Sequence, residues 1–268
     1  MDTRYDILFD DLRGRGEAAF VPFFTLGFPS LEASVNLALV ALDAGADAIE
    51  VGIPFSDPVA DGPAIQLAAR AALEGGATPV RCLEAIARIR ERTDAPIGIL
   101  TYANPVVRMG LTGFYEAASG AGADSVLVAD VPIFEADPFR SAALSGGVCP
   151  IFIAPPGCPA EALEEIAMSG EGYTYVVPRS GVTGCDTEVK DCARTIASLA
   201  DLGAPPCVVG FGVSRPDQVA GYAGMGAAGV ICGSALSGIV GSGPAGNSRV
   251  ASRLARFVSS MKAATGGA

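Results

Sequence analysis

The segment DAGADAIEVGIPFSDPVADGP, residues 43–63, contains the pattern on which the fold depends. It begins with a turn rich in glycine and alanine and continues into the apolar strand Ala48–Gly52. It leaves that strand through a proline-containing loop that ends at Asp61. Strands that are apolar along their whole length are typical of parallel sheets, because such strands are buried on both faces. The segment therefore predicts one unit of a protein in which buried strands alternate with helices.

The same kind of turn recurs along the chain. Residues 120–126 (GAGADSV) and 225–230 (MGAAGV) resemble residues 43–49 (DAGADAI), and each segment looks like a helix end, a turn and a strand start. Eight strand-like runs alternate with amphipathic runs and predict a single (β/α)8 barrel over residues 1–268, with its function at the C-terminal strand ends. The runs are Phe20–Leu26, Ala48–Gly52, Ile97–Thr101, Ser125–Ala129, Pro150–Ile153, Tyr173–Val177, Cys207–Gly210 and Gly229–Cys232.

Local sequence signals predict the start of one helix and the state of the C-terminus. Ser30 is a candidate N-cap for a helix over Leu31–Asp43, and the Gly/Ala-rich end Ala263–Ala268 is expected to be a frayed tail.

Composition narrows the class of protein. Half of the 268 residues are hydrophobic, which is enough for a large core, and the net charge of -11 argues against a nucleic-acid partner. The polar start shows no signal peptide, and no apolar run is long enough to span a membrane. Seven cysteines, an odd number without a CxxC pair, favour a reducing compartment. We therefore expect a cytoplasmic protein.

Two carboxyl groups flank the loop after the second strand-like run. Glu50 lies inside an apolar strand, where loss of hydration favours the protonated carboxyl and raises its pKa. Asp61 lies at the end of the loop and is expected to stay hydrated and ionised. Two carboxyl groups whose pKa values differ can supply an acid and a base at neutral pH. The alternative for Glu50 is a salt-bridged carboxylate at a strand end.

Three glycine-bearing segments follow the last three strand-like runs: Arg179–Gly184, Gly210–Ser214 and Cys232–Leu236. Glycine lets the backbone approach a ligand closely, so that N–H groups become the donors, and Ser234 is a candidate N-cap of a short helix. Each glycine alone is also consistent with a simple strand end. Together the segments predict a phosphate site at the last strands. Its expected residues are Gly184, Gly212, Gly233 and Ser234.

Two residue types are nearly or wholly missing. The chain has no histidine, which excludes a Ser-His-Asp triad and histidine-ligated metals. Its two lysines, Lys190 and Lys262, do not lie at the ends of strand-like runs, so neither is placed to form a Schiff base. We predict no metal and no cofactor.

The stretch Ala48–Pro63 resembles the signature of the tryptophan synthase alpha chain family. The resemblance covers nearly the whole chain and implies a TIM barrel of the ribulose-phosphate-binding type. The chain departs from the family pattern at Phe28 and Pro178. Further segments similar to those of the family occur in the same order: Phe20–Phe23, Thr101–Pro105, Asp124–Pro132 and Gly172–Tyr175.

The resemblance implies a carbon–carbon lyase of L-tryptophan biosynthesis. Its reaction is a retro-aldol cleavage of indole-3-glycerol phosphate to indole and glyceraldehyde 3-phosphate. Because no lysine or histidine is placed to receive the electrons, an indole ring protonated at C3 would be the electron sink. We expect Glu50 to transfer the protons and Asp61 to bind the indole N1–H.

Apolar side chains at strand ends match the family's positions for the indole pocket, although any one of them also suits the barrel core. Tyr102 and Tyr175 carry polar tips and are expected to contact the ligand or Asp61. The polar stretch Arg179–Lys190 is expected to be a mobile lid, on which the resemblance pairs Thr183 with Asp61. The apolar positions are Phe23, Leu100, Leu127, Ala129, Ile153, Phe211 and Ile231.

The resemblance also implies a partner, a pyridoxal-phosphate beta subunit in an alpha2beta2 complex. Three alternatives remain open: another phosphate-binding barrel such as an isomerase of the ribulose-phosphate type, a weakly catalytic subunit that activates a partner, and a free-standing lyase. The residues expected to face the beta subunit are Ser56, Asp57, Pro58, Asn104 and Asp130.

Overall fold

The computed structural model describes residues 2–178, 186–244 and 246–266. Its strands are all parallel and pair in chain order, and β8 pairs with β1 to close a barrel. The predicted TIM barrel is confirmed, and each strand end lies within one residue of its predicted position. The strands are β1 (Ala19–Thr25), β2 (Ile49–Gly52), β3 (Ile97–Thr101), β4 (Ser125–Val128), β5 (Cys149–Ala154), β6 (Thr174–Val176), β7 (Cys207–Val209) and β8 (Gly229–Cys232).

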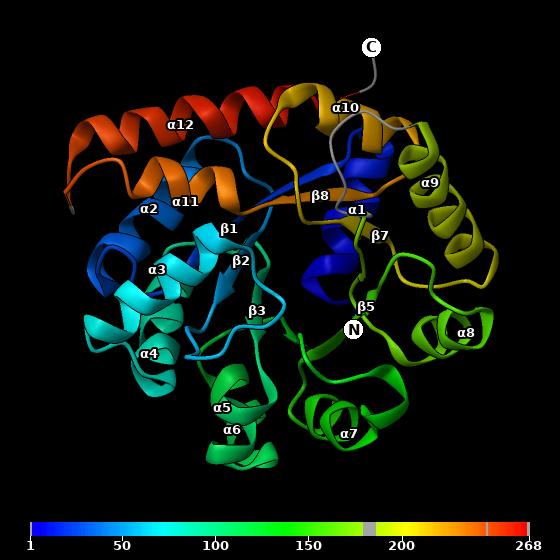
Figure 1. The fold of residues 1–268 in the computed structure, drawn as a ribbon, viewed down its shortest axis with the longest axis horizontal. Helices are drawn as coiled ribbons and strands as arrows, with labels where there is room; N and C mark the ends of the chain where they lie inside the picture. Colours follow the sequence, from blue (N-terminus) through cyan, green and yellow to red (C-terminus); the bar gives the residue numbers. More distant parts are fainter. Residues whose placement is uncertain (1, 179–185, 245, 267–268) are drawn as a thin grey trace.

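Helices surround the barrel, and α12 runs along one edge of the molecule (Figure 1). The predicted cap of α2 is confirmed, because the Ser30 side chain accepts a hydrogen bond from the Ala33 N–H. The helices are α1 (Arg4–Arg15), α2 (Leu31–Asp43), α3 (Pro63–Glu74), α4 (Pro79–Arg90), α5 (Ala103–Met109), α6 (Leu111–Gly120), the 3-10 turn η1 (Ile133–Glu135), α7 (Asp137–Ser145), α8 (Ala160–Ser169), α9 (Asp186–Asp201), α10 (Pro216–Gly224), α11 (Ser234–Val240) and α12 (Ser248–Ala263).

Helix α1 has a different position from the outer helices: it lies over the strands, inside the ring that those helices form (Figure 1). Its residues Tyr5, Phe9 and Leu12 belong to the same buried cluster as the side chains inside the barrel. The barrel leaves room for them because its inward positions near the N-terminal strand ends are small. These positions are Ala19, Ala48, Gly98, Ser125 and Gly229.

The repeated turn has a structural explanation at its aspartates. Asp47 accepts a hydrogen bond from the Phe20 N–H at 2.8 Å, and Asp124 accepts one from the Ile97 N–H at 2.7 Å. Each carboxylate therefore ties the start of one strand to the turn that leads into the next. The third copy has Ala228 at the corresponding position and lacks this bond.

Both aspartates also bind basic side chains. Asp124 pairs with Arg90 at 2.6 Å and Arg4 at 2.9 Å, while Asp47 pairs with Lys262 at 3.0 Å. The C-terminal segment is held at this end of the barrel too, because Thr265 is 2% exposed and its carbonyl accepts the N–H of the residue before β1. The expectation of a frayed tail is therefore wrong as far as Gly266, the last described residue.

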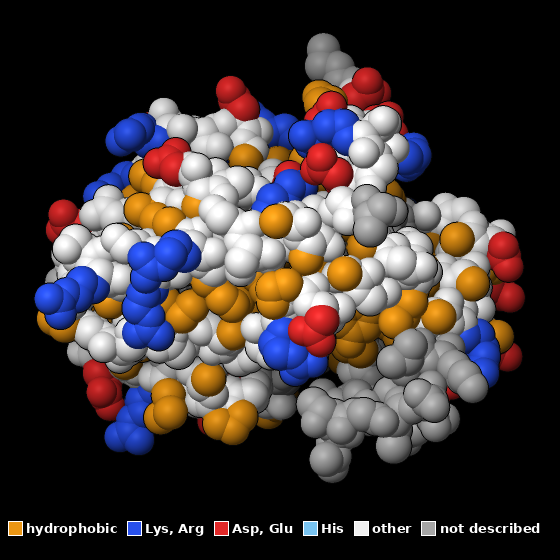
Figure 2. Space-filling model, turned by 90° about the horizontal axis from the view of Figure 1, so that it is seen from above, with side chains coloured by type: hydrophobic (Ala, Val, Ile, Leu, Met, Phe, Trp, Pro, Cys, Tyr) orange, Lys and Arg blue, Asp and Glu red, His pale blue; other side chains and the backbone are white. Residues whose placement is uncertain are grey.

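Charge is unevenly spread over the surface. Helix α12 contains basic residues and no acidic ones, although the whole chain has a net charge of -11. Figure 2, which views the molecule from the α12 side, shows blue side chains gathered toward one end of this face. The excess negative charge is therefore carried mainly by other parts of the molecule.

The partly buried ion pair of Asp124 yields a stability prediction. Asp124→Asn should lower the free energy of unfolding by about 3 kcal/mol, because it leaves the half-buried Arg90 guanidinium without its counter-charge. Glu74→Gln is the control, since it removes one partner of the exposed Arg70–Glu74 pair and should cost about 0.5 kcal/mol or less. Urea unfolding measures both values, and equal losses would contradict the assignment.

Candidate active site

The Glu50 carboxyl lies inside the barrel. Glu50 is in register with the inward residues Phe23 and Gly98 on the neighbouring strands, so its side chain points inward. It is 1% exposed. The Tyr173 hydroxyl donates a hydrogen bond to Oε1 at 3.0 Å, whereas Oε2 has no hydrogen-bond partner among the described residues. One oxygen is therefore held, and the other is buried with its hydrogen-bonding capacity unused by the described residues.

Burial raises the pKa of Glu50 to about 8. The loss of hydration is the largest cause, the nearby Asp61 charge adds to it, and the Tyr173 hydrogen bond opposes it. The carboxyl is therefore mostly protonated at neutral pH, as the sequence predicted. No arginine or lysine in the described part of the chain forms an ion pair with Glu50, so the salt-bridge alternative does not apply there.

Asp61 lies in the loop between β2 and α3. The Tyr102 hydroxyl donates a hydrogen bond to Oδ2 of Asp61 at 2.9 Å. Burial raises the pKa of Asp61 as well, although Tyr102 opposes the shift. The expectation of a hydrated loop-end carboxylate needs correction, because the loop folds back over the barrel mouth and removes water from Asp61. The two pKa values differ in the size of the shift rather than in its direction.

Both carboxyl groups open onto one cavity of about 190 Å³ at the C-terminal end of the barrel. Its wall is largely apolar, which suits a flat aromatic ligand. No lysine or arginine belongs to the described residues of this wall. The lining residues are Phe23, Glu50, Asp61, Gly62, Ile65, Leu100, Tyr175, Phe211, Gly212, Ile231, Gly233 and Ser234.

Some of the predicted ligand-contacting residues lie elsewhere. Leu127, Ala129 and Ile153 pack in the cluster inside the barrel without lining the cavity. Tyr102 does not line the cavity either, but the contact with Asp61 expected for it as an alternative to the ligand is present. Thr183 and Gly184 lie outside the described residues, as does the backbone of 179–185 in the predicted lid.

Two lining residues, Gly62 and Ile65, were not predicted from the sequence. Their signal was available, because Gly62 and α3 follow Asp61 directly and Ile65 is the first large apolar side chain of α3.

The wall after β7 requires a special backbone. A Cβ atom on Gly210 would collide with the phenol of Tyr175, so only glycine fits beside that ring. The next two residues are both left-handed, Phe211 with φ 72° and Gly212 with φ 75°. Phenylalanine rarely adopts this conformation, and such strain is concentrated at functional sites. The turn places the Phe211 ring edge-on to Tyr175, with 5.7 Å between the ring centroids.

The predicted phosphate residues Gly212, Gly233 and Ser234 all line the cavity. Helix α11 begins at Ser234, with Gly233 as the capping residue, so the prediction that Ser234 itself is the N-cap is wrong by one residue. The N-terminal end of α11 opens onto the cavity, and its backbone N–H groups favour a negatively charged ligand there.

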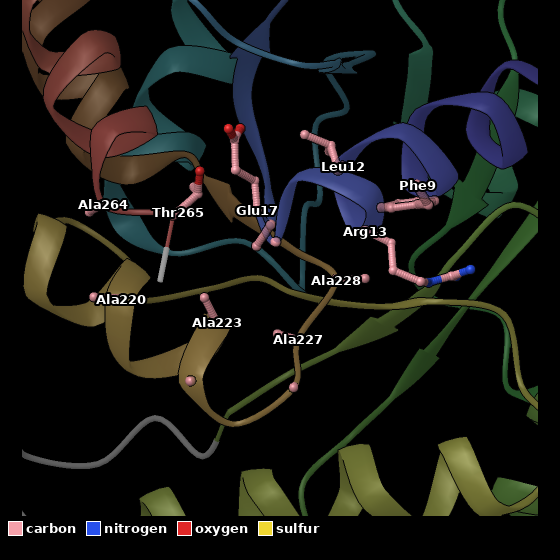
Figure 3. A pocket seen from close by; sticks show the side chains of 15 residues that line it. Phe9, Leu12, Arg13, Glu17, Ala220, Ala223, Ala227, Ala228, Ala264 and Thr265 are labelled. Atoms are coloured by element: carbon pink, nitrogen blue, oxygen red, sulfur yellow. The ribbon is translucent and has the colours of Figure 1, made fainter. Parts of the chain in front are cut away.

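A larger hollow of about 660 Å³ lies at the opposite end of the barrel. Figure 3 shows its wall, built from α1, α10, the turn before β8 and the segment after α12. Most of the wall is alanine and glycine. The two charged side chains among its described lining residues are already paired, Glu17 with Lys262 and Arg13 with Asp10. We therefore place the functional site at the smaller cavity.

These features define a TIM-barrel enzyme with paired carboxyl groups at the C-terminal mouth of the barrel. No helix in the described ranges combines the length and apolarity that a membrane crossing requires. Residues 9–266 match the family model described as tryptophan synthase alpha chain. The chain belongs to the tryptophan synthase alpha chain family.

Individual relatives agree with this assignment. The chain is 47% identical to a tryptophan synthase alpha chain of Shewanella oneidensis over 98% of its own length and 95% of the relative. The solved alpha subunit from Legionella pneumophila superposes with a TM-score of 0.88 at 29% identity, covering 99% of both chains. A chain in a tryptophan synthase structure from M. tuberculosis gives a TM-score of 0.88 at 28% identity, with full coverage of both.

The buried carboxyl predicts a pH-dependent stability. The pKa of Glu50 is 4.5 in the unfolded chain and about 8 in the folded chain. Between these two pH values the folded chain keeps the proton on Glu50, whereas the unfolded chain has released it. The stability gained from that proton is complete below pH 4.5 and is lost as pH rises through this window, at up to about 1.4 kcal/mol per pH unit. Glu50→Gln carries no such proton. The variant should therefore gain stability relative to the native chain as pH rises.

Urea unfolding of both chains across this pH range measures the difference. Glu17→Gln is a suitable control, because Lys262 lowers the pKa of Glu17 and the relative stability of that variant should not rise with pH. A constant difference between Glu50→Gln and the native chain would contradict the buried, protonated carboxyl.

Proposed function

We propose that this chain cleaves indole-3-glycerol phosphate to indole and glyceraldehyde 3-phosphate in the cytoplasm, as a step of L-tryptophan biosynthesis. The observation that carries the proposal is the arrangement of the protonated Glu50 carboxyl and Asp61 on one apolar cavity. An acid, a second carboxyl and an indole-sized apolar wall are what this reaction requires. Family membership supports the same activity.

The substrate itself accepts the electrons in this proposal. Glu50 donates its proton to C3 of the indole ring, and positive charge develops at N1, where the N–H donates a hydrogen bond to Asp61. The Glu50 carboxylate then takes the hydroxyl proton from the carbon attached to C3. The carbon–carbon bond breaks, its electrons return to the ring, and the hydroxyl carbon becomes the aldehyde.

The free Oε2 of Glu50 is the atom suited to these transfers, since Tyr173 occupies Oε1. Lys262 is unsuited to a Schiff base in this cavity because it pairs with Glu17 and Asp47 at the other end of the barrel.

The remaining lining residues suit the two ends of the substrate. Phe23, Leu100 and Ile231 offer apolar surface to the indole ring, together with the rings of Tyr175 and Phe211. The phosphate is assigned to Gly212, Gly233 and Ser234, with backbone N–H groups as donors. Leu127, Ala129 and Ile153 support this wall from behind, and Thr183 and Gly184 complete the site in the proposal.

Activity should depend on the Glu50 proton. Glu50→Gln should still bind indolepropanol phosphate, a substrate analogue, but should release indole at less than about a hundredth of the native rate, since it lacks the transferable proton. Glu74→Gln on the outer helix α3 is the matched control and should keep full activity. Indole release is followed in a coupled assay.

Substantial turnover by Glu50→Gln would remove Glu50 from the mechanism. Turnover of a ribulose phosphate instead of indole-3-glycerol phosphate by the native chain would favour the isomerase alternative.

Substrate affinity should depend on the charge at position 233. Gly233→Asp should raise KM for indole-3-glycerol phosphate by about 100-fold or more, because it places a negative charge where the phosphate is proposed to bind. Gly233→Ala tests the steric effect alone, since its Cβ would lie 3.2 Å from the Phe23 ring. If both variants shift KM equally, the effect is steric and the phosphate site lies elsewhere.

A beta subunit is the proposed partner, in an alpha2beta2 complex. Ser56, Asp57, Asn104 and Asp130 are exposed on the segments that follow β2, β3 and β4, and Pro58 is partly exposed. The same neighbouring segments expose large apolar side chains, a feature typical of protein interfaces. These side chains are Val59, Val107 and Phe134.

The proposed interface is linked to the cavity through Tyr102. Tyr102 caps α5, whose first N–H is held by Asp130 at 2.7 Å, and its hydroxyl binds Asp61. Docking on these segments would therefore fix Asp61 and raise kcat.

Adding excess beta subunit should raise indole-3-glycerol phosphate cleavage by at least about tenfold, which corresponds to roughly 1.4 kcal/mol of the barrier. Phe134→Ser should reduce this activation without changing the turnover of the chain alone, because Phe134 is exposed and does not line the cavity. Met168→Ser, at an exposed apolar residue on α8, is the control. Full activity of the isolated chain with no response to a beta subunit would instead identify a free-standing lyase.

A further inference from the structure

We propose that Tyr5 of α1 is a positioning residue for Glu50, because its ring holds the phenol of Tyr173 against the Glu50 carboxyl from the far end of the barrel. This inference rests on the proposed function of Glu50. Under this proposal α1 positions the catalytic carboxyl as well as packing in the core.

Tyr173 is the only side chain in the described ranges with a hydrogen bond to Glu50, and the two residues are 123 positions apart in the sequence. A ring on a side chain of this length turns about two torsions, so its hydroxyl reaches the carboxyl only if the ring itself is held. The Tyr5 ring meets the Tyr173 ring edge-on, with 5.3 Å between centroids and 62° between planes. This is a favourable aromatic geometry.

Tyr5 is itself held from three sides. Its hydroxyl shares a hydrogen bond with the Ser125 hydroxyl at 2.9 Å, and its ring stacks on Phe9 at 6.2 Å. The third constraint is the space beside Gly98. A Cβ atom there would lie 2.9 Å from Oγ of Ser125 and 3.1 Å from the hydroxyl oxygen of Tyr5. The barrel wall is therefore shaped to receive this side chain.

The arrangement makes a continuous path from the floor of the barrel to the candidate active site. It runs from Ser125 through Tyr5 and Tyr173 to Glu50, and it leaves Oε2 of Glu50 buried and without a hydrogen-bond partner among the described residues. A core residue would need only to fill space. Tyr5 also determines where Tyr173 lies, the one hydrogen-bond donor to the carboxyl among the described residues.

The charged and titratable groups around Glu50 indicate how its pKa should respond when Tyr173 is no longer held in place. The titratable groups that act on or respond to its charge are Tyr173, Asp61, Tyr175 and Tyr5. Among these, the Tyr173 hydrogen bond lowers the pKa of Glu50, while Asp61 raises it. Losing the position of Tyr173 should therefore raise the pKa of Glu50 further, and the carboxyl should lose its fixed orientation.

The test titrates the carboxyl directly by carbon-13 NMR of labelled glutamate side chains, with Glu50→Gln to identify the resonance. Tyr173→Phe provides the reference shift and should raise the pKa of Glu50 by at least about half a unit. Tyr5→Leu should shift it in the same direction. Tyr5→Phe keeps the ring and should restore most of the native value, and Leu12→Ala, further along α1, should leave the native value unchanged.

Kinetics provide the second measurement. Tyr5→Leu should lower kcat for indole release by about tenfold, corresponding to roughly 1.4 kcal/mol, with KM within about threefold of the native value. The descending limb of its kcat–pH profile should move to higher pH, in step with the raised pKa of Glu50. If Tyr5→Leu does not fold, Tyr5→Met replaces it in both measurements, because methionine fills more of the space without supplying a ring.

An unchanged Glu50 titration in Tyr5→Leu, or an equal shift in Leu12→Ala, would overturn the proposal and leave Tyr5 as a packing residue. The titration needs no turnover. A native chain that releases no indole would therefore overturn the proposed function, while the NMR result would still decide the role of Tyr5.

Discussion

Burial of the Glu50 carboxyl with no counter-charge among the residues that the structure describes is the constraint on which the rest of the site depends. A carboxylate in such a position is costly, so the proton stays on and the group becomes an acid at neutral pH. A nearby lysine or arginine would reverse this effect by stabilising the carboxylate. The part of the chain that the structure describes instead supplies one neutral donor, Tyr173, which orients the carboxyl and only partly offsets the effect of burial.

The inside of the barrel is built around this requirement by pairing very small residues with large rings. Gly52 leaves space for the Phe23 ring, Gly210 for Tyr175, and Gly98 for the hydroxyl of Tyr5. Phe23 and Tyr175 line the cavity at one end, while Tyr5 fills the other. Aromatic surface therefore extends through the barrel with little room for water, and the low polarity that raises the pKa of Glu50 follows from this packing.

The two ends of the barrel have different tasks. At the N-terminal ends of the strands, Asp47 and Asp124 join strand starts to basic side chains and hold α1 and α12 in place. At the C-terminal ends, loops carry Asp61 and the proposed phosphate and partner surfaces. This division is general for TIM barrels, where stability resides at one end and chemistry at the other. The path through Tyr5 would connect the two ends.

The sequence by itself determined the eight strands, because a buried parallel strand is recognisable from a short apolar run and needs no distant partner. It also indicated that Glu50 is buried, since a residue inside such a run has little access to water, whereas the lack of an ion pair that lets burial raise its pKa was decided by the tertiary structure. Only the tertiary structure decided which side chains meet. Tyr173 reaches Glu50 from a distant part of the chain, and Tyr5 in turn packs on Tyr173. Asp61 loses water because its loop folds over the mouth, and Leu127 packs beside the cavity rather than in it. Strand register and ring closure set these contacts, and neither can be read from a local pattern.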